Sequence, residues 1–244
     1  QIIDPNLHRL LEDGPHYRRQ YMDWGVFHVE HSFYPAWQRY RRALKQRNSA
    51  LRNGLPKTSI IAWDAELVQS ALIVDACRRG YVDALSKLTP EMVGRVMGDG
   101  KLVLDYHAGW PKDEELGAAL VRGLAGDQRA GFTHAGPHRA DLRVRVDTVT
   151  AKDWVSRGQQ KVITAVLLLA QAELLHHRRG IKPILLIDDL AAELGSSYRE
   201  SVLAAVKQLD GQCFLSFLDE SLVPKERGDA VMFHVEHGRI IRQG

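Results

Sequence analysis

Two adjacent carboxylates at the end of an apolar run are the first residues of this chain that could do chemistry. Asp188 and Asp189 follow the run Ile-Leu-Leu-Ile at 184–187 directly. Such a run predicts a buried central strand of a parallel sheet, and the ligands of open α/β folds collect at the carboxyl edge of the sheet. Acids at that edge are typical of a site for a metal ion.

A nucleotide site at this edge would also require a loop that cradles phosphate. In P-loop nucleotidases the acid after such a strand helps to hold the Mg²⁺ of ATP, and the loop reads G-x-x-x-x-G-K-[ST]. The nearest match, at 94–102, has Arg95 in place of the first glycine and Leu102 in place of the hydroxyl residue. Because the chain begins at Gln1 rather than at a methionine, we expect an N-terminally truncated sequence whose phosphate loop lies upstream. The chain by itself is expected to be inactive as an ATPase.

A second stretch suited to chemistry reads Ser-Arg-Gly-Gln, at Ser156, Arg157, Gly158 and Gln159. Serine is a good N-cap residue, and glycine lets a ligand approach closely. A helix N-terminus offers free N–H groups and the positive end of a dipole, which together favour phosphate. The alternative is that Ser156 only caps its helix.

The composition is that of a soluble globular protein. Charged residues make up 26% and hydrophobic residues 45% of the 244, enough to bury a core in one domain or two. Two widely separated cysteines predict reduced thiols and a cytoplasmic protein. The most apolar segment, 162–175, is too short for a membrane span and contains Gln171 and Glu173.

Helical patterns dominate the first half of the chain, and strands alternate with helices in the second. Helices are expected over 35–52, 63–88, 114–124, 156–177 and 196–209. Strands are expected at 102–110, where the strand ends in a turn, and at 139–147, 182–188 and 212–217, with two short strands within 230–241. The alternation implies a largely parallel sheet with helical crossovers.

Several long segments together resemble one family. Ser-Arg-Gly-Gln, followed about 30 residues later by the strand that ends in Asp188, has the order of signature motif and Mg²⁺-binding strand in ABC-type ATPases. Over nearly the whole chain the sequence resembles the RecF family, SMC-like proteins of DNA replication and repair. The segments that carry this resemblance are 14–30, 37–48, 136–145, 156–159, 186–194 and 232–240.

The resemblance implies an α/β fold, namely an incomplete ABC/SMC-like P-loop ATPase head with a mainly parallel sheet, plus an inserted helical arm. Residues 1–15 would be a remnant of the N-terminal ATPase lobe. Residues 16–133 would form the helical arm, and 134–244 the signature-motif helix with the C-terminal part of the ATPase core.

The same resemblance implies roles for individual residues. Asp188 would be the Mg²⁺ ligand, and Asp189 would take the catalytic position where most ABC ATPases have Glu; the shorter side chain is consistent with slow hydrolysis. The signature residues 156–159 would face the γ-phosphate of ATP held by a second subunit, and Gln1 would be the Q-loop glutamine. At 193–195 this chain reads Glu-Leu-Gly where the family usually has Glu-Leu-Asp, in a loop that touches the partner subunit.

For the intact protein, the family implies a weak ABC-type ATPase that forms an ATP-dependent homodimer with ATP and Mg²⁺. It would bind single-stranded or gapped DNA in recombinational repair and replication-fork maintenance. With RecO and RecR it would help to load RecA. No membrane partner is expected.

A basic helix is the candidate DNA contact. Between residues 36 and 55 the chain has six basic residues and no acid: Arg39, Arg41, Arg42, Lys45, Arg47 and Arg52. A helix of this length can follow several phosphates, whose neutralisation dominates non-specific binding. The alternatives are a solvated face, or arginines paired with acids elsewhere in the arm.

Two other functions compete with the ATP-gated one. Without a phosphate loop, the chain could be a DNA-binding or scaffold fragment that ignores ATP. The pentapeptide Phe-His-Val-Glu-His, which occurs at 27–31 and 233–237, could form a zinc site. In a strand, however, His234 and His237 would point to opposite faces.

Overall fold

The computed structural model describes all residues except 99, 148, 152–155, 190–193, 210, 224–229 and 244. The helices are α1 (Arg9–Glu12), α2 (Pro15–Val29), α3 (Phe33–Arg52), α4 (Lys57–Ile61), α5 (Asp64–Met97), α6 (Leu116–Ala130), α8 (Arg157–Arg179) and α10 (Ser196–Gln208), with 3-10 turns η1 (Pro137–Arg139) and η2 (Glu220–Leu222). The strands are β1 (Ile2–Ile3), β2 (Leu102–His107), β3 (Asp141–Val146), β4 (Val149–Thr150), β5 (Ile184–Ile187), β6 (Gln212–Leu215), β7 (Met232–Glu236) and β8 (Arg239–Gln243).

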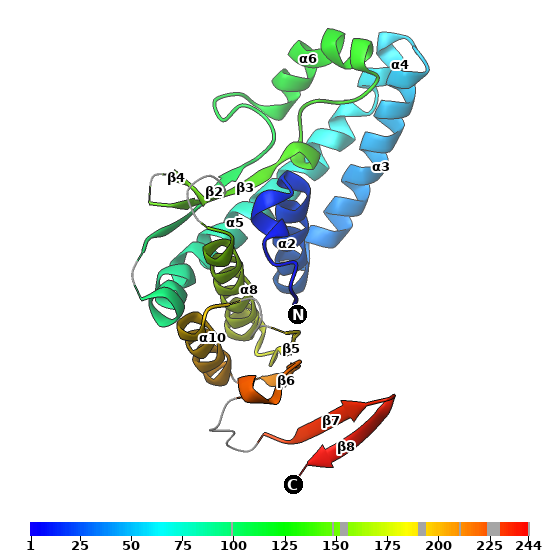
Figure 1. Cartoon of the computed structure of the whole chain (residues 1–244). Helices are drawn as coiled ribbons and strands as arrows, with labels where there is room; N and C mark the ends of the chain where they lie inside the picture. Colours follow the sequence, from blue (N-terminus) through cyan, green and yellow to red (C-terminus); the bar gives the residue numbers. More distant parts are fainter. Residues whose placement is uncertain are drawn as a thin grey trace.

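The long helix α5 joins an extended helical arm to a compact body (Figure 1). Its first half packs against α3 and α6 in the arm, and it also packs against α8 and α10 in the body. The hairpin β7–β8 projects away from the body (Figure 1). The arm and the body therefore share one continuous helix.

Helix α8 lies in the middle of the body and is buried along most of its length. Between Gln160 and Leu175 only Lys161, Leu168 and Glu173 are more than slightly exposed. A helix that is apolar on nearly every side has to be covered on every side, and here α2, α5 and α10 all pack against it. Within the described residues, none of the helices has a stretch long and apolar enough to cross a membrane.

Close packing around α8 requires a glycine on α2. A Cβ atom at Gly25 would collide with the ring of Tyr81 on α5 and with Gln171 on α8. The Gln171 amide donates to the Tyr81 hydroxyl (2.8 Å) and to the Tyr21 carbonyl (2.9 Å). These bonds satisfy a polar side chain inside an apolar core, which would otherwise be costly to bury.

Strands β1, β5 and β6 form the expected parallel sheet, with β5 in the centre. The prediction that β5 is buried on both faces is wrong. Leu185 and Ile187 belong to the same core cluster as residues of α8 and α10, whereas Ile184 and Leu186 on the other face are 54% and 42% exposed. Only one face of this small sheet is covered in the described structure.

The other two sheets are antiparallel, so the expectation of a mainly parallel architecture holds only for β1–β5–β6. Strand β2 pairs with β3 over their full lengths, and β3 continues to β4. Strands β7 and β8 form a hairpin around His237 and Gly238. The β2–β3 pairing also crosses the domain boundary proposed at residue 133.

Helix α5 is longer than the sequence pattern predicted, because it ends at Met97 rather than near residue 88. It continues through Pro90, which cannot donate a backbone hydrogen bond and normally disrupts a helix. The turn beyond the proline buries Met92, Val93 and Val96 in the main core cluster. Burial of these three side chains offsets the cost of the proline.

A buried arginine holds the arm together. Arg47 on α3 has no exposed side-chain surface; its guanidinium lies 2.7 Å from Asp64 on α5 and 2.7 Å from Asp127 on α6. It also donates to the Thr133 hydroxyl at 2.8 Å. A second buried arginine, Arg78, joins α5 to α2 through two hydrogen bonds to Asp23 (2.8 and 2.9 Å).

We predict that Arg47→Met lowers the free energy of unfolding by about 3–5 kcal/mol, because it removes the guanidinium that pairs with buried Asp127 and leaves that carboxylate only its contacts with His134. Arg41→Met is the matched control on the exposed side of the same helix and should change the free energy by less than about 0.5 kcal/mol. Urea denaturation of both variants measures the difference. Equal, small losses would contradict the structural role of Arg47.

Candidate functional site

Asp188 and Asp189 leave the carboxyl end of β5, and Ser216 leaves the adjacent strand β6 beside them. The Ser216 amide donates to the Ile187 carbonyl at 2.9 Å, which continues the parallel pairing to the end of the strands. On the other side of β5, the Asp188 amide donates to the Ile3 carbonyl at 2.8 Å. Neighbouring strands on both sides thus position the first acid.

The Ser216 side chain connects the two acids. Its hydroxyl donates to Asp188 Oδ1 at 2.5 Å and accepts a hydrogen bond from the Asp189 amide at 3.1 Å. One hydroxyl therefore orients both residues. In the sequence, Ser216 stands where ABC transporters would have a switch-loop His, and that position left its role open. The available signal for an orienting role was a serine directly after the strand neighbouring the acidic strand, where side chains at the same edge converge.

The backbone at Asp189 turns sharply, with φ at +45°. This left-handed conformation is unfavourable for residues other than glycine, although Asp and Asn tolerate it best. One carboxylate oxygen of Asp189, Oδ1, is buried and has no hydrogen-bond partner in the described structure. A buried carboxylate oxygen without a donor is costly, and a cation would satisfy it.

The residues at this edge fit a magnesium ion. Mg²⁺ takes oxygen ligands and is usually held by one or two protein carboxylates, with water and substrate phosphates completing the coordination. Asp188 offers a carboxylate oriented by Ser216, and Asp189 offers a buried oxygen without a hydrogen-bond partner. Together they match that requirement. The described residues contain no group of three or more His, Cys, Asp or Glu that could hold a metal ion by themselves.

The zinc hypothesis has no support in the described residues. The first Phe-His-Val-Glu-His copy lies at the end of α2 and in the turn that follows, and the second lies in β7 and its turn. His234 and His237 each approach Glu236, at 3.5 and 3.8 Å. All three side chains are more than half exposed.

Ser156 caps α8, as the sequence predicted. Its hydroxyl accepts a hydrogen bond from the Gln159 amide (3.3 Å), and the Gln159 side chain accepts one from the Ser156 amide (3.0 Å). Ser156, Arg157, Gly158 and Gln159 are all exposed, whereas Gln160 is buried. The first turn of α8 thus meets solvent, and the Arg157 side chain is 85% exposed. Such a turn is open to an anionic ligand.

The structure does not bring Gln1 to the acids. The Gln1 carbonyl accepts from the Leu186 amide (2.9 Å), which places this residue roughly 10 Å along the strand from Asp188 at about 3.3 Å per residue. Its side-chain amide donates to Gln171 on α8 at 3.2 Å. The Q-loop role of Gln1 remains a hypothesis.

Of the loop at 193–195 that is predicted to touch a partner subunit, residue 193 lies outside the described residues. Of the Glu-Leu-Gly sequence at 193–195, Leu194 is buried and Gly195 is the N-cap residue of α10.

The six basic residues of α3 fall into three groups. Arg47 is buried in ion pairs, so the prediction that it contacts DNA is wrong: a guanidinium without exposed surface cannot reach a phosphate. Arg39 is exposed, but its guanidinium binds Glu66 in two hydrogen bonds (2.7 and 3.0 Å). The third group is exposed and contains Arg41, Arg42, Lys45 and Arg52.

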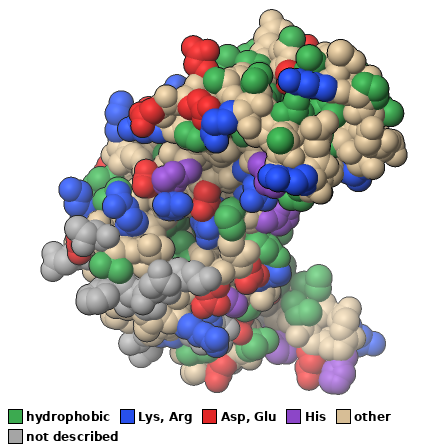
Figure 2. All heavy atoms as spheres, turned by 90° about the horizontal axis from the view of Figure 1, so that it is seen from above, with side chains coloured by type: hydrophobic (Ala, Val, Ile, Leu, Met, Phe, Trp, Pro, Cys, Tyr) green, Lys and Arg blue, Asp and Glu red, His purple; other side chains and the backbone are tan. Residues whose placement is uncertain are grey.

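Arg41, Lys45 and Arg52 lie on one side of α3. At 100° per residue their directions fall within about 40° of each other, and Arg41 and Arg52 are roughly 17 Å apart along the axis. This side is opposite the buried residues Tyr40, Ala43 and Arg47. On the face that Figure 2 shows, Lys and Arg side chains lie among Asp and Glu rather than in one unbroken patch. A short row is therefore a better candidate for phosphate contact than the whole basic helix.

Comparison with known proteins gives consistent results. No family model matches the chain. Over 98% of its length the chain is 43% identical to "DNA replication and repair protein RecF" of Pseudomonas putida (strain W619), and 41% identical to the protein of the same name from Pseudomonas paraeruginosa. It spans 66% of the length of each of these relatives.

Solved structures agree in fold. One described as "Structure of the recombination mediator protein RecF-ATP in RecFOR pathway" matches the whole chain with a TM-score of 0.84, at 21% identity and over 67% of that chain. A second, of the same protein described with ATPrS, also has a TM-score of 0.84. The expected fold, an α/β body with a helical arm, is thereby confirmed.

We predict that Asp189→Gly is more stable than Asp189→Ala by about 1 kcal/mol, because only glycine adopts positive φ without strain. Both variants lose the carboxylate, so the comparison isolates the backbone. The control pair is Asp113→Gly and Asp113→Ala, at an exposed residue without positive φ; here the alanine variant should be at least as stable. Thermal unfolding measures both pairs, and the same order at both positions would refute the strained turn.

Proposed function

The chain belongs to the RecF family, and from that premise we propose that it acts in an ATP-dependent DNA-binding protein of recombinational repair. The observation that carries the proposal is the pair of acids at the end of β5, oriented by Ser216 and flanked by strands on both sides. The relatives that share this sequence are named DNA replication and repair proteins. A structural neighbour is described with ATP.

We assign Asp188 to the Mg²⁺ that accompanies ATP and Asp189 to the water that attacks the γ-phosphate. Bound Mg²⁺ would neutralise charge on the phosphates. Ser216 keeps Asp188 turned toward the edge of the sheet, and its hydrogen bond to the Asp189 amide holds the turn that aims the second acid. A carboxylate that is oriented in advance loses less conformational entropy when it acts.

Ser156, Arg157, Gly158 and Gln159 are proposed to meet ATP held by a second copy of the protein. Their exposure at the N-terminus of α8 supports this, because a site that serves a partner subunit has to be open before the partner arrives. Arg157 can add a positive charge, because its side chain is 85% exposed although its guanidinium lies 3.9 Å from Glu12. ATP would thus hold two copies together as a homodimer.

DNA is proposed to bind along the exposed row Arg41, Lys45 and Arg52, with Arg42 beside it. The row lies on the arm, and α5 connects the arm to the body that contains α8. If two copies of the protein dimerise through the N-terminal turns of their α8 helices, their two arms would be held in fixed positions relative to each other.

The proposal also covers the kind of DNA that is bound and the partner proteins. We propose single-stranded or gapped DNA as the ligand, and cooperation with RecR and RecO in loading RecA. The support is the family relationship, since the protein in one structural neighbour is described as a recombination mediator in the RecFOR pathway.

The first test replaces Asp188 with Asn in the intact protein. We expect ATP-dependent dimerisation and DNA binding to weaken at least about tenfold, because the amide loses the charge that holds the cation. Light scattering and fluorescence anisotropy, each with and without Mg²⁺ and ATP, measure the two effects. Asp113→Asn, an exposed acid away from this edge, should behave as wild type. Unchanged dimerisation and DNA binding in Asp188→Asn would refute the assigned role.

The second test replaces Arg41, Lys45 and Arg52 with Ala in one variant. If all three neutralise phosphates, the slope of log K against log salt for single-stranded DNA should fall by about 2. Arg39→Ala, which removes an arginine already paired with Glu66, should change the slope by less than about 0.5. A triple variant with the wild-type slope would show that DNA binds elsewhere.

A further inference from the structure

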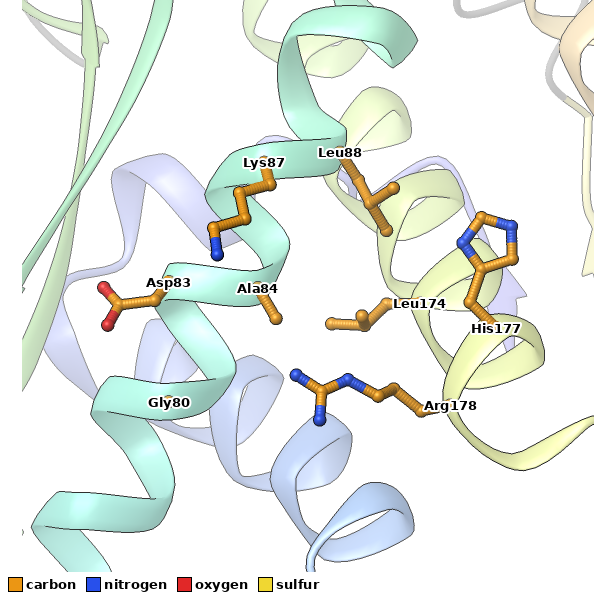
Figure 3. A pocket seen from close by; sticks show the side chains of 8 residues that line it. All are labelled: Gly80, Asp83, Ala84, Lys87, Leu88, Leu174, His177 and Arg178. Carbon is orange, nitrogen blue, oxygen red and sulfur yellow. The ribbon is translucent and has the colours of Figure 1, made fainter.

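A groove between α5 and α8 combines an apolar floor with basic side chains at its rim. Neither the proposed ATP site nor the proposed DNA-binding row uses these residues. It has a volume of about 450 Å³ and lies between the middle of α5 and the C-terminal end of α8 (Figure 3). It is lined by Gly80, Asp83, Ala84, Lys87, Leu88, Leu174, His177 and Arg178. Leu174 is roughly 27 Å along α8 from Ser156, so the groove is separate from the signature turn.

The floor of the groove is apolar. Leu174 of α8 is 4% exposed and belongs to the main core cluster, and Ala84 and Leu88 of α5 pack against the same cluster. Gly80 widens one end, because no atom lies within 4 Å of the position where its Cβ would be. This floor offers room and apolar surface for one inserted side chain.

The rim of the groove carries basic side chains from both helices. Lys87 belongs to α5, whereas His177 and Arg178 belong to α8, and the Arg178 guanidinium extends across the groove toward Gly80 (Figure 3). Among the described residues, neither Lys87 nor Arg178 has an acid within ion-pair distance. Asp83 is the one acid in the lining. Nearby Glu173 is bound by Arg95 at 3.1 Å and also lies 3.9 Å from His177.

We infer that this groove binds an acidic peptide segment of a partner protein, anchored by one apolar side chain. The anchor would lie on Ala84, Leu88 and Leu174, and carboxylates on either side of it would reach Lys87 and Arg178. A guanidinium can hold a carboxylate through two parallel hydrogen bonds, which gives direction as well as charge. Complementary charge at the rim would raise the association rate.

The groove fits a peptide better than it fits nucleic acid. Single-stranded nucleic acid is typically bound by stacking its bases on aromatic side chains, and the lining has no Phe, Tyr or Trp. A duplex backbone would use the two cations but would leave the apolar floor without a partner. An acidic segment with an apolar anchor uses both. This inference does not depend on the proposed ATP and DNA function.

The test uses the intact protein and a fluorescein-labelled peptide in which aspartates flank a Leu-Phe pair. Anisotropy should show binding, with a Kd in the micromolar range typical of short peptides, about 1–100 μM. Lys87→Glu combined with Arg178→Glu should weaken binding at least about tenfold. Asp83→Asn should strengthen it about twofold, because it removes the one acid of the lining.

Two variants of Gly80 that differ in side-chain size test the apolar floor of the groove without changing its charge. Gly80→Met fills the groove from an exposed helical position and should weaken peptide binding at least about tenfold. Gly80→Ala, the matched control, should leave binding nearly unchanged. Because a Cβ at this position meets no atom within 4 Å, both variants should fold, which their unfolding temperatures will confirm.

Three outcomes would overturn the inference. The first is no binding of the peptide at millimolar concentration. The second is equal binding of a peptide with Ser-Ser in place of Leu-Phe, which would make the groove a general anion surface. The third is binding of a single-stranded oligonucleotide that competes with the peptide and is lost with the charge reversals but not with Gly80→Met. That result would assign the groove to nucleic acid.

Discussion

Burial of α8 on nearly every side is the constraint on which the rest of the structure depends. This helix is too apolar to meet water, so α2, α5, α10 and the parallel sheet all pack around it. The packing fixes its open first turn at one end and the cationic groove at the other. It also supports the covered face of the sheet, from whose edge Asp188 and Asp189 project. The proposed nucleotide and peptide sites are therefore supported by the same packed core.

The arm depends on a second kind of constraint, charges buried in pairs. Arg47 links three helices through Asp64 and Asp127, and Arg78 ties α5 to α2. Losing one partner of a buried pair is costly, so Arg47 fixes how α3 and α6 lie on α5, and Arg78 fixes how α2 lies on α5. The same basic helix thus divides its cations between two tasks: those facing inward hold the arm in shape, and those facing outward are available to phosphate.

The sequence predicted most elements and the acidic edge, because periodicity and capping are local properties. The cap at Ser156 and the strand before Asp188 were found where expected. What it missed depends on contacts between distant segments. Ser216 acquires its role only when β6 lies beside β5. Arg47 is buried because acids 17 and 80 residues away converge on it. Whether both faces of β5 are buried depends on which elements cover the sheet, and an apolar run in the sequence does not show this.

Asp188, at the end of β5, is proposed to hold the Mg²⁺ that accompanies ATP, and ATP is proposed to join two copies of the protein. The most direct measurement is the molar mass of the intact protein by light scattering, with ATP present and Mg²⁺ either supplied or removed by EDTA. We expect a dimer with Mg²⁺ and ATP and a loss of that dimer when the metal is chelated. The same ATP-dependent dimer in EDTA would contradict the metal-binding role of Asp188.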